Sequence, residues 1–194
     1  MTQKTRETGI ITRFALLFEA GVLLFAWILG WFLSIPTLRQ MNVTWASLTA
    51  GVLATGPLLL GMWWCSHSRL KPLRRLMRQV DESLVPLFMG TSSGFLLLIS
   101  LLAGLGEELL FRGVFQSGLT SWLGLPVALV ATSTLFGLAH LITPTYAILA
   151  GLIGFYFGML AVFTDSLIAP VVAHTLYDWA ALTYLVSSKR RQTS

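Results

Sequence analysis

The sequence predicts an all-α integral membrane protein, a bundle of about six transmembrane helices with a polar intramembrane site. Three observations lead to this fold class. Of the 194 residues, 55% are hydrophobic and only 11% are charged, which lies outside the usual range of soluble domains. The apolar residues form six long runs, and nearly all basic residues flank those runs. A chain of this length is expected to form one membrane domain over residues 1–194.

The first two spans are expected at residues 14–33 and 45–64. Pro36 ends the first because proline cannot continue a helix, and Pro57 predicts a kink in the second. The first run is long enough to span and lacks a small-residue cleavage site, so no cleavable signal peptide is expected. A polar loop follows at residues 65–83. It carries five basic residues, Arg69, Lys71, Arg74, Arg75 and Arg78.

The third span is expected at residues 94–118. Apolar sequence already begins at Val85, so 85–105 is the alternative, but the glycine- and serine-rich segment 90–94 favours a break before the later start. The remaining spans are expected at 126–141, 146–163 and 167–186. Their lengths fit helices that cross a hydrocarbon core of about 30 Å, although the fourth and fifth spans are short.

The placement of charge predicts the orientation. With six spans, both ends of the chain and the loop 65–83 lie on one side, and all but two of the 13 Lys and Arg residues are there. The exceptions are Arg39, on the other side, and Arg112, inside the membrane. The positive-inside rule therefore places both termini in the cytoplasm. Because the net charge of +5 follows the topology in this way, no nucleic-acid partner is expected.

Two carboxylates and an arginine interrupt the third apolar run, at Glu107, Glu108 and Arg112. Inserting a charged side chain at bilayer depth costs roughly 2.5–3.5 kcal/mol of free energy, so these residues are expected to have a structural or functional role. Glu108 and Arg112 are four residues apart with the acid first, which favours an ion pair on a helix. Glu107 lies about 100° round the helix and has no local partner. An unmatched buried carboxylate is suited to act as a general base.

Two further polar groups lie at helical spacing in later spans. Phe136 and His140 share a face of the fourth span, and His174 and Asp178 share a face of the sixth. Intramembrane ionisable residues normally face the bundle interior and one another. The three clusters, on three different helices, therefore favour one common site.

Each cluster also has a structural interpretation. The Glu108–Arg112 pair can be a structural ion pair, an intramembrane histidine can hydrogen-bond a neighbouring helix, and Asp178 can hydrogen-bond Tyr184 or water. Glu19 lies one turn into the first span and is expected to reach the interface. Close helix packing is indicated by the glycines of the fifth span, Gly151, Gly154 and Gly158.

Three motifs follow one another along the chain: Glu107-Glu108-x-x-x-Arg112, Phe136-x-x-x-His140 and His174-x-x-x-Asp178. In this order they resemble the motifs of the CAAX protease and bacteriocin-processing (CPBP, or Abi) family, which includes the type II CAAX prenyl endopeptidase. The resemblance covers the motif-bearing core, residues 94–186. The first 83 residues resemble the family only in being hydrophobic. Each motif is weak alone, and the three in order are specific.

The resemblance implies hydrolysis of a peptide bond within the membrane by a glutamate-activated water. Matched by position, Glu107 and His140 polarise the water, and Glu108 and Arg112 support the site. His174 and residue 178 stabilise the tetrahedral oxyanion. The family often has Asn at the last position, and an ionised Asp cannot donate a hydrogen bond to an oxyanion. Asp178 can instead orient His174 and keep it protonated, so that the imidazolium is the donor.

The alternative is a zinc site, because two histidines and two glutamates could serve as zinc ligands. The sequence has no His-Glu-x-x-His motif, and Cys65 is its single cysteine. Arg112, one turn from Glu108, opposes a bound cation. The expected chemistry is therefore free of metal and of other cofactors, with a zinc-dependent protease of the same family as the alternative.

The predicted function is that of an intramembrane endopeptidase acting on a membrane-embedded or lipid-associated peptide or protein, in contact with membrane lipid. An alternative of another class is a catalytically silent membrane protein that gives bacteriocin immunity by binding. A proton-coupled transporter is disfavoured because no internal repeat is present. The short chain, without targeting extensions, favours a bacterial inner membrane. The oligomeric state and the substrate are not determined by the sequence.

Overall fold

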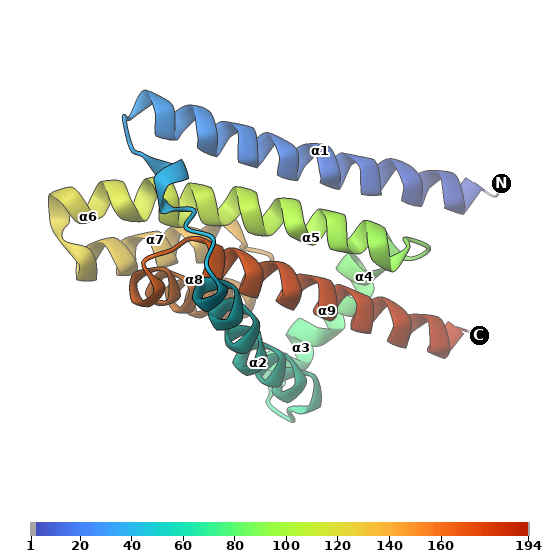
Figure 1. The fold of residues 1–194 in the computed structure, drawn as a ribbon. Coiled ribbons are helices and arrows are strands. Elements are labelled where there is room, and N and C mark those ends of the chain that lie inside the picture. The colour runs from blue at the N-terminus through green and yellow to red at the C-terminus, as the bar shows by residue number, and fades with distance from the viewer. Residues whose placement is uncertain (1–2, 194) are drawn as a thin grey trace.

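The structure is a computed structural model that describes the backbone of residues 3–193 and the side chains of residues 10–191. Within that range every regular element is a helix, so the predicted all-α membrane fold is confirmed (Figure 1). Four helical stretches are long and apolar enough to cross a membrane. They lie in α1 (Gln3–Phe32), in α2 (Trp45–His67), in the continuous stretch Ser93–Leu123, and in α8 (Pro144–Thr164).

The other two predicted spans also form helices, α7 (Leu125–Ala139) and α9 (Ile168–Thr193). The apolar α7 has only 15 residues. The longer α9 has 26 residues, but its polar site residues and its basic last turn lower its hydropathy. Neither qualifies as a span by length and composition, so the count of six spans stays a prediction.

The third span combines three helical segments. It begins with α5 (Ser93–Glu108), continues as a π-helix, η3 (Leu109–Gln116), and ends with α6 (Ser117–Leu123). Ser92 caps the start by accepting a hydrogen bond from the backbone N–H of Phe95 at 3.3 Å. The predicted break before this span is confirmed, whereas the π-helix after the glutamates was not expected.

The expectation of a polar loop at 65–83 is wrong, because most of that segment is helical. Here α3 (Lys71–Gln79) is followed by a π-helical turn, η2 (Val80–Leu84), and by the short α4 (Val85–Phe88). A helix forms because Leu73 and Leu76, three residues apart, bury one face of α3 against the protein. A short 3₁₀ helix, η1 (Thr37–Gln40), connects α1 to α2.

The packing places α5 between α1 and α9, while α9 also packs on α2, and α7 pairs with α8. The N-terminal and C-terminal ends of the described chain lie at the same end of the bundle (Figure 1). The predicted close packing of the α8 glycines is confirmed. A Cβ atom added at Gly154 would lie 3.1 Å from Phe136, and one added at Gly158 would lie 2.7 Å from Gln116.

Candidate active site

Glu108 is the fully buried centre of the polar cluster. Its Oε1 atom accepts a hydrogen bond from Arg112 Nη1 at 3.2 Å, and His174 Nδ1 lies 2.9 Å from the same oxygen. Arg112 Nη2 donates to the backbone carbonyl of Gly154 at 2.5 Å. The predicted Glu108–Arg112 pair is therefore present, and it also ties the third span to α8 and α9.

Aromatic rings enclose the charged groups of this centre. The Arg112 guanidinium lies over the ring of Phe136, 4.6 Å from its centroid, and the ring of Phe157 is 5.7 Å away. The imidazole of His174 stacks on Phe157 with ring centroids 5.0 Å apart. Since a desolvated cation is attracted to the face of an aromatic ring, these contacts help to hold Arg112 in an apolar setting.

Glu107 and His140 form a more accessible pair, with 14% and 25% of their side chains exposed. His140 follows the last residue of α7, and its Nδ1 atom lies 2.8 Å from the carbonyl oxygen of Phe136. A carbonyl can only accept, so Nδ1 carries the hydrogen. The other ring nitrogen, Nε2, lies 3.5 Å from Glu107 Oε2.

This geometry leaves two hydrogen-bond acceptors facing each other. In the neutral ring of His140, Nε2 carries a lone pair, and Glu107 Oε2 has no hydrogen-bond partner among the described residues. One water at about 2.8 Å from both atoms would donate a hydrogen to each. The pair is thus suited to hold a water with its oxygen lone pair directed outward.

Asp178 contacts His174, and its Oδ2 atom lies 3.3 Å from Nε2 of that ring. His174 therefore has a carboxylate beside each nitrogen, Glu108 at Nδ1 and Asp178 at Nε2. Both contacts are hydrogen bonds only if both nitrogens carry a hydrogen, as they do in the imidazolium. The alternative hydrogen bond between Asp178 and Tyr184 is not present among the described residues, where Asp178 contacts His174.

The three predicted clusters meet, although simple counting along the spans puts His140 and His174 at different depths. Both imidazoles contact the ring of Phe136, at centroid distances of 4.5 and 6.1 Å. They come together because α7 is short and ends one residue before His140. The structure thus brings together Glu107, Glu108, Arg112, His140, His174 and Asp178.

Glu19 is an acidic neighbour of this cluster that the candidate site predicted from the sequence does not include. It is half-buried, and its Oε2 atom is buried without a hydrogen-bond partner among the described residues, while the expectation that it reaches the interface stays a prediction. It interacts electrostatically with Glu107 and with His140. Close approach of α1 is possible because Gly106 has no side chain, and a Cβ there would lie 3.3 Å from the Glu19 carbonyl. An acid in the middle of an apolar run was the available signal.

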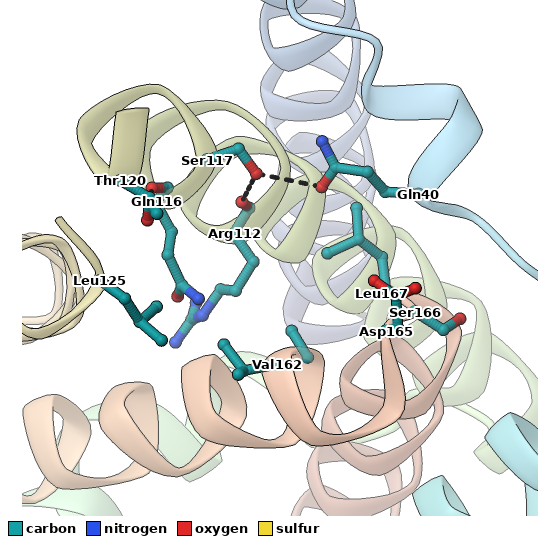
Figure 2. A pocket seen from close by; sticks show the side chains of 11 residues that line it. Gln40, Arg112, Gln116, Ser117, Thr120, Leu125, Val162, Asp165, Ser166 and Leu167 are labelled. Carbon is teal, nitrogen blue, oxygen red and sulfur yellow. Dashed lines mark hydrogen bonds between the residues drawn. The ribbon is translucent and has the colours of Figure 1, made fainter. Parts of the chain in front are cut away.

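A cavity of about 330 Å³ lies beside Arg112, between the α6 end of the third span and the end of α8 (Figure 2). Its wall includes Ser117, whose Oγ lies 3.1 Å from Gln40 Oε1 and 3.0 Å from the carbonyl oxygen of Arg112. Arg112 is the one predicted site residue in its lining. A common cavity for Glu107, His140 and His174 therefore stays a prediction.

The described residues do not fit a resident zinc ion. Among them, no group of three His, Cys, Asp or Glu side chains is placed to hold a metal. Glu108 and His174 are engaged with each other, and His140 Nδ1 is engaged with a backbone carbonyl. Only Glu107 Oε2 and His140 Nε2 face each other without another partner, and two ligands do not complete a zinc site.

Residues 90–180 match the model of a family described as type II CAAX prenyl endopeptidase Rce1-like. The matched residues contain all three motifs. This segment is similar to the Rce1-like family. The predicted resemblance is thereby confirmed, and the match supports a CAAX-type intramembrane protease. The Rce1-like segment includes α5 and α7, while α1 and α2 precede it. No curated protein and no solved structure matches the chain.

Proposed function

We propose that the protein is a glutamate-type intramembrane endopeptidase whose reacting water is held by Glu107 and His140. The observation that carries the proposal is the 3.5 Å approach of Glu107 Oε2 and His140 Nε2. Glu107 Oε2 is buried and has no hydrogen-bond partner among the described residues, although the two side chains retain 14% and 25% exposure. A water between them would be both positioned and polarised, which is what general-base hydrolysis requires.

In the proposed reaction, the water donates to Glu107 Oε2 and His140 Nε2 and attacks the carbonyl carbon of the scissile peptide bond. Glu107 takes one proton of the water as the new C–O bond forms. The tetrahedral intermediate then collapses, the C–N bond breaks, and the proton passes from Glu107 to the leaving amine. The products are a new carboxyl terminus and a new amino terminus.

His174 is the proposed donor to the oxyanion. Its Nδ1–H is used by Glu108 at 2.9 Å, whereas its contact with Asp178 through Nε2 is longer, at 3.3 Å. The Nε2–H is therefore the more weakly held donor and the one assigned to the oxyanion, and Asp178 keeps the ring protonated and oriented. Arg112 balances the charge of Glu108. Donors aimed at a developing oxyanion usually supply a large part of the rate enhancement.

The proposed protease uses neither a metal nor another cofactor. Its substrate is a membrane-embedded or lipid-associated peptide or protein, and nucleic acid is not a partner. Its location is a bacterial inner membrane with both termini in the cytoplasm, as the flanking basic residues favour. The competing functions are a zinc-dependent protease of the same family and a silent immunity or binding protein.

The test compares membrane proteomes of cells that express the wild type, cells that express Glu107→Gln, and cells without the protein. We expect new peptide termini in membrane proteins only with the wild type. The same new termini with Glu107→Gln would contradict the proposed base. The absence of new termini in all three would favour the binding protein.

A further inference from the structure

The surface of α3 carries a dense patch of positive charge. Within ten residues there are five exposed basic side chains, Arg69, Lys71, Arg74, Arg75 and Arg78. None of them forms a hydrogen bond or an ion pair with a described residue. The nearby Asp81 does not neutralise them, because it is paired with Lys189 at 2.5 Å. The exposed Glu82 also follows in the chain, but it forms no ion pair with these side chains, so no described acid is paired with the patch.

An apolar cavity of about 180 Å³ lies beside the patch. Its walls come from α3, η2 and α4 and include Leu76, Leu84 and Leu87, and Ile142 also lines it. Leu87 and Ile142 are also exposed on the surface, at 37% and 47%. A buried cavity of about 150 Å³ is already large enough for a benzene-sized hydrocarbon. The space is thus suited to part of a hydrocarbon chain.

The patch and the cavity share the same helix. Gln79 lines the cavity, and Arg75 lies one turn before it, so both side chains are on one face of α3. Arg78 adjoins Gln79 in the chain. An amphiphile with its anionic group at Arg75 and Arg78 can therefore place its chain in the cavity.

The neighbouring residues place this region at a membrane surface. Trp63 and Trp64, near the end of α2, expose 58% and 53% of their surface. Tryptophan is enriched at the level of lipid headgroups. The chain then enters α3 four residues after His67, the last residue of α2.

We propose that α3 and its apolar cavity form a binding site for an anionic phospholipid. The phosphate pairs with Arg75 and Arg78, and one acyl chain enters the cavity beside Leu76. A neutral lipid would leave the arginines without a counter-charge, and an acidic protein surface would leave the cavity empty. Because Ile142 lies two residues after His140, the lipid would border the proposed active site without contributing to the chemistry.

The test measures lipid retention by the full-length protein in detergent, using native mass spectrometry. The probes are phosphatidylglycerol and phosphatidylcholine with identical acyl chains. We expect the wild type to retain phosphatidylglycerol at least about tenfold better, since two arginines act on its charge. The double variant Arg75→Gln/Arg78→Gln should lose this preference. Arg39→Gln, which removes an exposed charge outside this patch, is the matched control and should keep it.

Two further measurements keep the test decisive if the double variant is unstable. High salt should erase the preference of the wild type, because exposed charges are screened. Ser83→Phe, which fills the cavity from an exposed position, should lower the retention of both lipids. Equal retention of the two lipids by the wild type would overturn the proposal. So would an equal loss of preference in Arg39→Gln, or a preference that high salt leaves unchanged.

Discussion

Glu107 and Glu108 are neighbours in the sequence, but their surroundings give them different tasks. Glu108 is fully buried, with Arg112 and His174 both on its Oε1 atom. Glu107 retains some exposure, and its Oε2 atom lies 3.5 Å from Nε2 of His140. The first arrangement holds a cluster together, and the second leaves a buried carboxylate oxygen without a hydrogen-bond partner among the described residues.

Replacing Glu108 with Gln should lower stability as well as activity. The amide removes the negative charge that balances Arg112, and breaking a buried pair costs about 3–5 kcal/mol. We expect a clear fall in the Tm of the purified protein in detergent. Glu82→Gln, at an exposed acid, is the control and should leave the Tm unchanged. A Glu108→Gln protein as stable as the wild type would show that this pair does not hold the site.

Asp178→Asn should be tolerated, because Asn can still accept a hydrogen bond from His174 and can also donate one to an oxyanion. Asp178→Leu leaves His174 Nε2 without its acceptor, so the proposed oxyanion donor loses its orientation, and we expect kcat to fall by about 100-fold or more, as it does when an oxyanion donor is lost. The measurement is kcat for a cleaved peptide with each variant. Equal rates for the Asn and Leu variants would remove residue 178 from the mechanism.

Contacts within one helix could be predicted from residue spacing, and contacts between helices could not. Glu108–Arg112 and His174–Asp178 are four residues apart, so helical geometry alone brings them together. The contacts of His174 with Glu108 and of His140 with Glu107 depend on how α7 and α9 pack against the third span. The position of Glu19 beside the cluster could not be predicted for the same reason, since it depends on the approach of α1 to Gly106.

At the scale of the elements, apolar runs located the long helices, but two irregular features had a weaker signal. The segment before residue 85 is polar on average, and its helix forms because Leu73 and Leu76 are buried on one side. The π-helix from Leu109 to Gln116 could not be predicted from the apolar runs, because a π-helix and an α-helix in this position can have the same hydrophobic residues. Such segments are frequent at functional sites.

The contact of α7 with α8 should depend on Gly137. An added Cβ atom would lie 2.5 Å from the backbone carbonyl oxygen of Ala147, and a backbone atom cannot turn aside as a side chain can. We expect Gly137→Ala to destabilise the protein by about 1–3 kcal/mol, as overpacking does. The measurement is the Tm in detergent, followed by activity.

Gly61→Ala is the matched control, since a Cβ there meets nothing within 4 Å in the helix α2. Its Tm should stay level or rise slightly, because alanine favours a helix. If both alanine variants behaved alike, the close approach of α7 and α8 would not contribute to stability.

At the scale of the whole molecule, the membrane fold and the Rce1-like segment agree with the sequence analysis, while the division into one domain over residues 1–194 stays a prediction. Both α7, which has 15 residues, and the more polar α9 contribute residues to the candidate site. His140 directly follows the last residue of α7, and His174 and Asp178 lie inside α9. A site built in this way weakens the apolar signal of the helices that carry it.

The whole protein should carry no stoichiometric zinc, because its described side chains do not form a group of ligands. Cleavage should survive exhaustive chelation. The measurements are zinc per purified protein and activity before and after chelator treatment. One zinc per chain, with activity lost on chelation and restored by added zinc, would favour the metalloprotease.

The central claim is that Glu107 is the base for a water shared with His140. The most direct measurement is kcat for a cleaved peptide with the purified wild type and Glu107→Gln, reconstituted in lipid, with Tm as the check on folding. Glutamine keeps the shape of the side chain and removes the base, so we expect turnover to fall by at least about 100-fold, in line with general-base catalysis, while the Tm changes little. A folded Glu107→Gln protein that cleaves at the wild-type rate would contradict the claim.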